Sequence, residues 1–159
     1  MQVFLPYPEF SRCAASLDDK RLNKQIVELC QLLNIRANEG NDCFFAHSRH
    51  PVYKHYRDKP DFLLSYLDKL CLEYYFRFSK LHNACFTLSG YLTFFGVDPN
   101  TLTDTPNGLA VFVGNGNVTS ENPYPLYRRL LNAKWKESPP RFTRRTPPQF
   151  FGENIKDTD

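Results

Sequence analysis

The 159-residue chain is long enough for one domain with its own hydrophobic core, and its hydrophobic content of 42% is ordinary. A net charge of only +3 excludes a chain that is basic throughout, so any contact with nucleic acid must come from local clusters of basic residues. The sequence has no run of 18 apolar residues and no basic N-terminal leader, so we expect a cytoplasmic protein rather than a membrane-spanning or secreted one.

Residues 1–10 contain two prolines and are not expected to be helical. The best-defined helix is predicted over Leu17–Arg36, with the hydroxyl of Ser16 as its N-terminal cap and with Asp18 and Asp19 in its first turn. The apolar residues of this helix recur at helical spacing and form one stripe: Leu22, Ile26, Leu29 and Leu33.

Spacing and turn composition predict the remaining elements. They are a loop over 37–50, a short helix over 51–57, a long helix over 60–82, a further helix over 84–95, turns over 96–122 with a short extended piece at 109–113, and a helix over 123–135. We therefore predict a mainly α fold: a single compact helical domain over residues 1–150 with long loops and a Pro-rich C-terminal arm, followed by an acidic tail over 151–159.

The face of the 17–36 helix opposite the apolar stripe has an unusual composition. Five polar side chains fall within an arc of about 100°, and only one of them is an acid: Lys20, Arg21, Lys24, Glu28 and Gln31. A single carboxylate among cations is typical of a site that meets an anion. The alternative is a solvated helix face with ion pairs one turn apart, such as Lys24 with Glu28.

Two further basic clusters follow. Arg49, His50 and Lys54 lie in a loop that enters a helix, which suits phosphate contact. Arg128, Arg129 and Arg144 lie among aromatic residues, a pattern typical of a surface that follows a nucleic-acid strand. The alternatives are an ordinary polar loop and a solvated helix end with a disordered arm.

The histidines and cysteines do not predict a metal site. Three of the four histidines lie close together, but their spacing does not match a zinc ligand set, and the five cysteines contain no CxxC pair. We expect no metal and no cofactor, and we expect the cysteines to be reduced thiols that are mostly buried.

Several segments resemble the phage-type pyrimidine-dimer DNA glycosylase (endonuclease V) family and its divergent phage and bacterial members. The segments are LDDKRLNKQIVELCQLL, RHPVYKHY, YPLYRRLLNAKW and RRTPPQFF. The resemblance implies a DNA N-glycosylase with possible abasic-site lyase activity on damaged or modified pyrimidines. It also implies double-stranded DNA as the partner, a monomer, and the host cytoplasm if the chain is phage-encoded.

The resemblance also implies a chemistry. In the family an amine attacks C1′ of the damaged nucleotide, assisted by a glutamate eleven residues after the leucine that begins the motif. In this chain that position is Glu28, and the candidate amines are those of Met1, Lys20 and Lys24. The chain has Arg21 where the family has a histidine and Gln31 where it has a phosphate-contacting arginine. Two alternatives stay open: a non-catalytic DNA-binding protein on the same scaffold, and an enzyme that acts on modified nucleotides.

Overall fold

The computed structural model describes residues 3–33, 60–94, 96–105, 111–113, 118–120 and 122–156. The predicted loop at 37–50 and the predicted short helix at 51–57 lie outside these residues. Within them the fold is mainly α, which confirms the predicted class.

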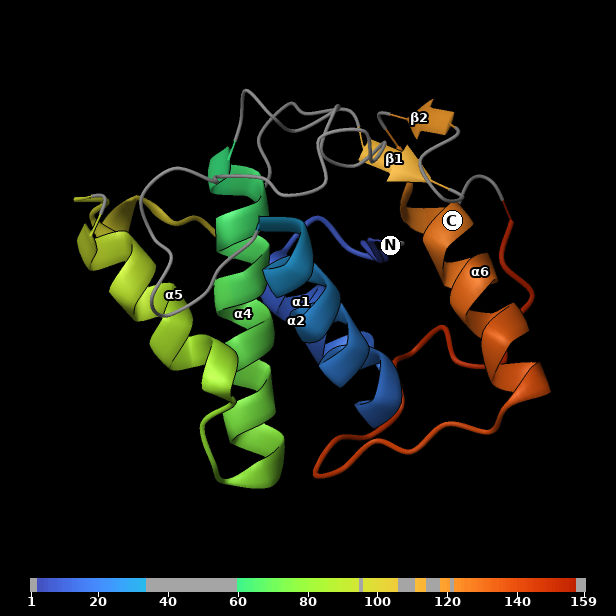
Figure 1. The fold of residues 1–159 in the computed structure, drawn as a ribbon. Helices are drawn as coiled ribbons and strands as arrows, with labels where there is room; N and C mark the ends of the chain where they lie inside the picture. Colours follow the sequence, from blue (N-terminus) through green and yellow to red (C-terminus); the bar gives the residue numbers. More distant parts are fainter. Residues whose placement is uncertain are drawn as a thin grey trace.

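The helix α4, Pro60–Phe78, lies at the centre of the fold (Figure 1). Helices α1, Phe10–Ser16, and α2, Asp19–Leu33, pack on one side of it, and α5, Asn83–Phe94, packs on the other. The apolar stripe of α2 faces this core, since Leu22, Ile26 and Leu29 are fully buried. Removing that stripe from water supplies the main drive for α2 to pack here.

A short β-hairpin follows the single-turn 3-10 helix η1, Pro99–Thr101. Strands β1, Val111–Val113, and β2, Val118–Ser120, are antiparallel, and Phe112 pairs with Thr119. The strand β1 lies inside the predicted extended piece at 109–113. The partner strand β2 falls in a region where only turns were predicted.

The helix α6, Tyr124–Glu137, joins the other helices through two extended stretches of chain (Figure 1). One is the N-terminal segment, residues 3–7, in which Val3, Phe4 and Leu5 are buried. The other is the C-terminal arm, residues 139–156, which contains no helix. Aromatic rings connect all three parts: Phe4 lies 6.4 Å from Tyr127 between ring centroids, and Trp135 stacks on Phe150 at 5.9 Å.

The arm remains in contact with α6 beyond residue 150. Ile155 is 7% exposed, and the amide of Asn132 donates to the carbonyls of Phe150 and Glu153. The predicted boundary between a domain ending at 150 and an acidic tail stays a prediction. No described helix is long and apolar enough to cross a membrane.

The predicted helices over 84–95 and 123–135 agree with α5 and α6 to within a few residues. The long predicted helix over 60–82 is confirmed as α4 but ends at Phe78, because Ser79 adopts a left-handed conformation with φ 55°. This geometry closes the last turn of α4, with the N–H of Ser79 donating to the carbonyl of Tyr75 at 2.9 Å.

The start of the motif helix differs from the prediction. The hydroxyl of Ser16 does not cap α2; it donates to the carbonyl of Arg12, at 2.7 Å, within the preceding helix α1. Helix α1 itself was not predicted. Its first turn is capped from far along the chain, since the carboxylate of Asp104 accepts from both the N–H and the hydroxyl of Ser11. A seven-residue helix held by a distant cap leaves little local pattern.

Candidate active site

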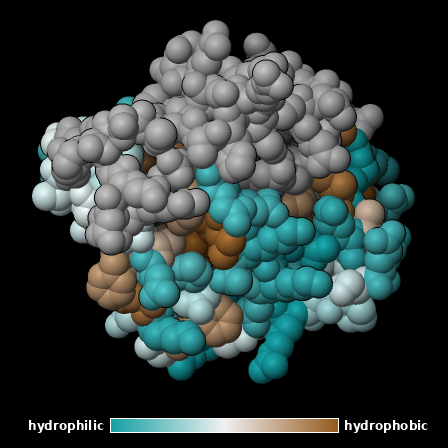
Figure 2. All heavy atoms as spheres, viewed as in Figure 1, coloured by the Kyte–Doolittle hydropathy of each residue, from teal (hydrophilic) through white to brown (hydrophobic). Residues whose placement is uncertain are grey.

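The polar face of α2 points away from the helical core, as its composition indicates. Lys20 and Gln31 are exposed, and the side chain of Lys24 is 68% exposed. Glu28 is more sheltered, at 24%, and its Oε1 lies 3.8 Å from Nζ of Lys24. Figure 2 shows hydrophilic side chains over much of the described surface between α2 and α6. The helix therefore presents one partly sheltered carboxylate on a polar surface.

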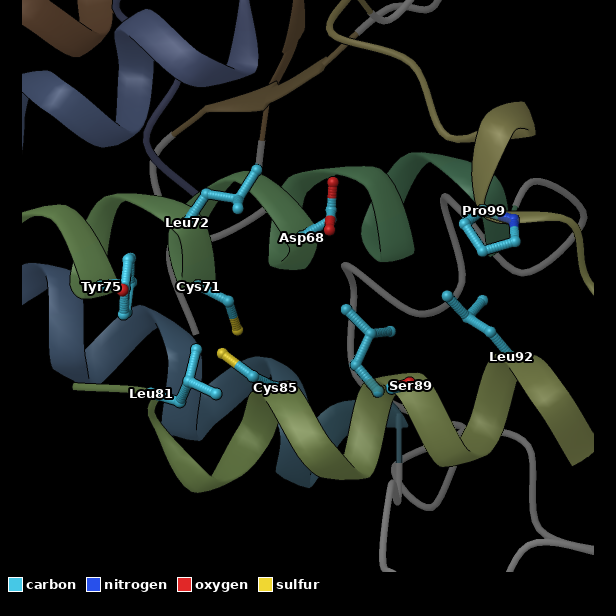
Figure 3. Close-up of a pocket in the computed structure, with 10 residues that line it drawn as sticks. Asp68, Cys71, Leu72, Tyr75, Leu81, Cys85, Ser89, Leu92 and Pro99 are labelled. Atoms are coloured by element: carbon cyan, nitrogen blue, oxygen red, sulfur yellow. The ribbon is translucent and has the colours of Figure 1, made fainter.

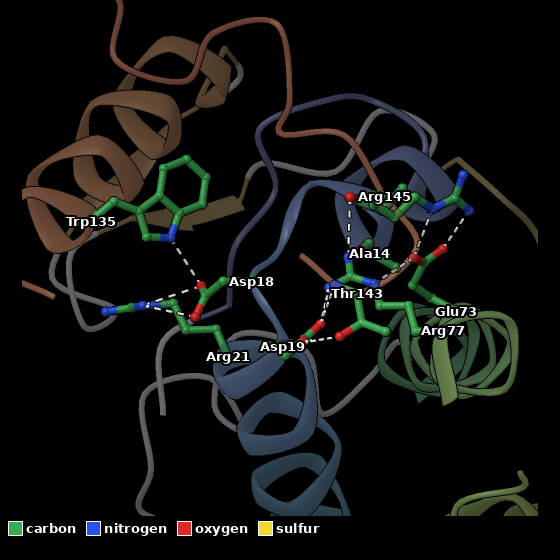
Figure 4. Close-up of polar contacts among 10 residues, drawn as sticks. Ala14, Asp18, Asp19, Arg21, Glu73, Arg77, Trp135, Thr143 and Arg145 are labelled. Atoms are coloured by element: carbon green, nitrogen blue, oxygen red, sulfur yellow. Dashed lines mark hydrogen bonds and ion pairs between the residues drawn. The ribbon is translucent and has the colours of Figure 1, made fainter. Parts of the chain in front are cut away.

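Arg21 belongs to this face by sequence but turns toward a buried acid. Its guanidinium lies 3.1 Å and 3.2 Å from the two carboxylate oxygens of Asp18, which is 3% exposed. The indole N–H of Trp135 donates to the same carboxylate at 2.9 Å (Figure 4). Asp18 therefore ties the start of α2 to α6, and Arg21 balances its charge.

The next acid of the motif, Asp19, meets a second arginine. The guanidinium of Arg77, which is fully buried, lies 3.0 Å from Oδ1 of Asp19. Thr143 on the C-terminal arm donates to Asp19 from its backbone N–H at 3.0 Å and from its hydroxyl at 2.5 Å. The N–H of Asp19 in turn donates to the carbonyl of Arg141 on the same arm, at 2.8 Å.

Arg77 has further partners, and together they form a network (Figure 4). Its Nε donates to Glu73 at 2.7 Å, and its other amino group donates to the carbonyls of Ala14 and Ala15. Glu73, only 6% exposed, also accepts two bonds from Arg145, at 2.9 Å and 2.7 Å. The network thus joins α1, α2, α4 and the arm through paired charges, which is how buried charges are tolerated.

The network changes the acid–base behaviour of Asp19. Burial alone raises the pKa of a carboxyl, but the hydrogen bonds from Thr143 and Arg77 outweigh it and hold the pKa of Asp19 below its usual 3.8. Asp18 and Asp19 were predicted to favour the helix dipole from the first turn. Their buried partners show that they also attach the motif helix to the rest of the fold.

The N-terminal segment passes beside the middle of α2. The hydroxyl of Tyr66, on α4, lies 3.3 Å from the carbonyl oxygen of Phe4 and 2.9 Å from Oε1 of Gln25. Gln25 is buried and stands one turn before Glu28 on α2. A single hydroxyl thus brings the N-terminal backbone and the turn of α2 that precedes Glu28 to the same place.

Two more side chains hold the N-terminal segment. Nε of Arg128, on α6, donates to the carbonyl of Pro6 at 2.9 Å, and the thiol of Cys13 donates to the carbonyl of Tyr7 at 3.0 Å. The ring of Tyr7 has the guanidinium of Arg12 at 3.9 Å from its centroid and that of Arg128 at 4.8 Å. The segment is therefore anchored on α1, α4 and α6.

The other predicted DNA-contact residues have partners outside α2 or lie outside the described residues. Arg129 approaches the carbonyl of Ile155 at 3.5 Å, and Arg144 donates to the carbonyl of Phe76 and to the hydroxyl of Ser79 at the end of α4. Three predicted contacts, and the candidate amine of Met1, lie outside the described residues: Arg49, His50 and Lys54.

A groove of about 440 Å³ lies between α4 and α5 (Figure 3), and no predicted site residue lines it. Its walls are mostly apolar, with Leu72 and Leu81 about half exposed. Figure 3 shows the sulfur atoms of Cys71 and Cys85 facing one another. Burial raises the pKa of the nearby Cys30 to about 11. All four described cysteines are free thiols, in agreement with the prediction for them.

The sequence did not reveal the buried partners of the motif. Glu73, Arg77 and Trp135 lie far from α2 in the chain, and Arg145 lies in the arm that was predicted only to be Pro-rich. A charged residue in line with an apolar helical stripe is the available signal, and Arg77 is one, because it stands two turns after the buried Leu70. Among the described residues, no group of three His, Cys, Asp or Glu side chains could hold a metal ion.

The comparison with protein families returns one match. The model for pyrimidine dimer DNA glycosylase matches residues 1–86, more than half of the chain, and the match includes the whole of α1 and α2. No curated protein and no solved structure matches the chain.

The buried network predicts an unequal response of two acids on α4. Glu73→Gln should lower the free energy of unfolding by about 3 kcal/mol, because Arg77 then keeps its buried charge with one carboxylate fewer. Asp68→Asn, the matched control, removes the partly exposed pair with Lys69 and should cost less than about 1 kcal/mol. Urea denaturation measures both, and equal costs would contradict the structural role of Glu73.

The lowered pKa of Asp19 predicts a dependence of stability on pH. A carboxyl whose pKa is lower in the folded state stabilises the fold above its unfolded pKa, and this stability is lost as the pH falls through the folded pKa. Thr143→Val removes a hydrogen bond to the charged form, so it should cost about 1.5–3 kcal/mol at pH 7.

The loss of stability between pH 7 and pH 3 should be smaller in Thr143→Val than in the unchanged protein, because the variant raises the folded pKa of Asp19. Urea midpoints at the two pH values measure this difference. Thr87→Val removes a hydroxyl bonded only to a backbone carbonyl within α5 and is the control. If Thr143→Val and the unchanged protein lose the same stability between pH 7 and pH 3, Asp19 is excluded as the source of that loss.

Proposed function

We propose that this chain, which belongs to the pyrimidine dimer DNA glycosylase family, acts on a damaged or modified pyrimidine in double-stranded DNA. Base removal would be followed by cleavage of the strand at the abasic site. The DNA would have to kink, or a nucleotide would have to leave the stack, for the chain to reach the sugar. We propose a monomer as the active form.

The proposed reaction proceeds in three steps. The nitrogen of an unprotonated amine bonds to C1′ while the bond from C1′ to the base breaks, and the base leaves with a proton. Opening of the sugar ring converts the new C–N bond into a protonated imine. Loss of a proton from C2′ then expels the 3′ phosphate by β-elimination. Glu28 would move protons at the ring oxygen and at C2′, and its charge would stabilise the iminium cation.

The position of Glu28 is the observation that carries this proposal. Glu28 stands eleven residues after the leucine that begins the motif, and it lies in the region that the family model matches. Its side chain is 24% exposed, so the carboxylate is partly sheltered. Gln25, one turn before it, shares the Tyr66 hydroxyl with the backbone of Phe4. The backbone of Phe4, three residues after Met1, is thus held close to the turn of α2 that precedes Glu28.

The Met1 amine is the preferred nucleophile on chemical grounds. An α-amine has an ordinary pKa of about 8, lower than that of a lysine side chain, so a larger fraction is unprotonated near neutral pH. Three residues lead from Phe4 back to Met1, and such a stretch spans at most about 10 Å. Lys20 and Lys24 are the alternatives, and both side chains lie on the polar face of α2.

The cations of this face would bind the DNA backbone. Lys20, Lys24 and Arg21, with Gln31, are proposed to contact phosphates, and the further candidates outside α2 are Arg49, His50, Lys54, Arg128, Arg129 and Arg144. Phosphate contacts release counterions, so binding should weaken steeply as salt rises. The Asp18 carboxylate would hold Arg21 in a fixed orientation toward such a phosphate.

One observation favours the alternative of a DNA-binding protein without catalysis. Glu28 lies 3.8 Å from Lys24, as expected for an ion pair on a solvated helix. Under this alternative, DNA binding is salt-sensitive but no covalent product forms. An enzyme that acts on free modified nucleotides would be inhibited by mononucleotides, whereas a duplex enzyme would not.

Borohydride trapping on dimer-containing duplex DNA should yield a covalent protein–DNA product. Glu28→Gln should slow the formation of this product by on the order of 10²-fold or more, because a positioned acid–base group is lost. Glu137→Gln, which changes an exposed acid at the end of α6, should leave the rate unchanged. DNA binding that survives in Glu28→Gln, with no trapped product from the unchanged protein on any damaged duplex, would favour the non-catalytic alternative.

Peptide mapping of the trapped product should place the DNA on Met1. Lys20→Arg and Lys24→Arg should therefore both still trap, since arginine keeps the charge that binds phosphate but is a poor nucleophile. Mass spectrometry of the digested adduct identifies the modified amine. DNA attached to Lys20 or Lys24 would reassign the nucleophile while leaving the role of Glu28 intact.

A further inference from the structure

We propose that Tyr66 is a positioning residue that sets the distance between the N-terminal amine and Glu28. The inference rests on the proposed function, since it concerns the same amine and the same carboxylate. Tyr66 stands on α4, the central helix, so the position it sets would be coupled to the core of the fold rather than to the surface.

The hydrogen bonds at Tyr66 form a junction rather than a single contact. Its hydroxyl oxygen lies 2.9 Å from Oε1 of Gln25 and 3.3 Å from the carbonyl oxygen of Phe4. One hydroxyl proton serves only one acceptor fully at a time. The hydroxyl donates to Oε1 of Gln25 at the shorter distance and approaches the carbonyl of Phe4 at the longer one, so the two acceptors share one proton. The junction then runs from α2 through α4 to the N-terminal backbone.

The surroundings keep this junction in place. Tyr66 is fully buried, and its ring packs against Phe10 of α1 at 5.6 Å between centroids. Burial raises the pKa of the Tyr66 hydroxyl well above its ordinary value. The hydroxyl therefore stays protonated, and can donate, over the whole pH range in which an α-amine titrates.

Two other contacts hold the N-terminal segment on the C-terminal side of Phe4. Arg128 holds the carbonyl of Pro6, and Cys13 holds that of Tyr7. Of these three anchored carbonyls, that of Phe4 lies nearest to the amine in sequence. The contact at Phe4 should therefore affect the position of the amine relative to Glu28 more than the other two do.

Tyr66→Phe removes the hydroxyl and keeps the ring. With damaged duplex in excess and borohydride present, the rate constant of trapping should fall by on the order of tenfold or more, since small misplacements of reacting groups slow chemistry strongly. The final amount of trapped protein, which counts folded active molecules, should be unchanged, and so should the dissociation constant for DNA. A loss of amount without a change in rate constant would mean a merely structural role and would overturn the proposal.

Two further variants separate position from folding. Tyr74→Phe, also on α4, is the control. It removes the hydroxyl from a ring packed on Phe78 and His82 and should leave the rate constant of trapping unchanged. A second glutamine inserted between Gln2 and Val3 leaves every residue from Val3 onward unaltered but moves the amine by one residue. It should lower the rate constant as Tyr66→Phe does, and an unchanged rate constant would overturn the proposal.

A measurement without DNA tests the position independently of activity. The α-amine is reductively methylated with ¹³C-formaldehyde and cyanoborohydride, and the pKa of the methylated amine is followed by NMR. Glu28→Gln should lower this pKa, because a nearby carboxylate favours the protonated amine, and the effect should shrink in a Tyr66→Phe background. If the pKa of the α-amine is the same in Glu28→Gln as in the unchanged protein, the positioning proposal is overturned even if trapping succeeds. If the pKa changes in Glu28→Gln but no product is trapped, the result counts against the proposed reaction alone.

Discussion

Arg77 is the residue on which the arrangement of the helices depends. Its guanidinium is fully buried in α4 and meets Glu73 on its own helix, Asp19 at the start of α2, and two carbonyls at the end of α1. A buried cation is tolerated only with its partners in place, so these elements must assemble together. Glu73 and Asp19 then bind Arg145 and Thr143, which places the C-terminal arm across the start of the motif helix.

This arrangement gives the two halves of the motif different tasks. Asp18, Asp19 and Arg21, at its start, bind buried partners and fix where α2 begins. Lys24, Glu28 and Gln31, further along, are turned to the polar surface. Substitutions of Asp18 or Asp19 would therefore disturb the candidate site indirectly, by moving the helix that carries Glu28, while substitutions of Glu28 would act on the proposed chemistry itself.

Local pattern was enough to predict α2, α4, α5 and α6, because each carries apolar residues at helical spacing that become buried. The polar face around Glu28 followed from the same spacing. The Ser16 cap was wrong because α1, whose cap comes from Asp104, already uses that hydroxyl. The contacts of Asp18 with Trp135 and of Asp19 with Thr143 could not be predicted, since these partners stand 117 and 124 residues away. Hydrogen bonds over such separations leave no periodic signal.

The same long separations have a consequence for the order of events during synthesis. A ribosome releases α2 well before Thr143 and Arg145. Until then, the first turn of the helix that bears Glu28 lacks its contacts with the C-terminal arm. Asp19 and Glu73 remain only partly paired until the arm emerges. The first turn of the motif helix is thus among the last parts of the fold to gain all of its contacts. In a newly made chain, the start of α2 would be fixed only after the C-terminal arm has docked.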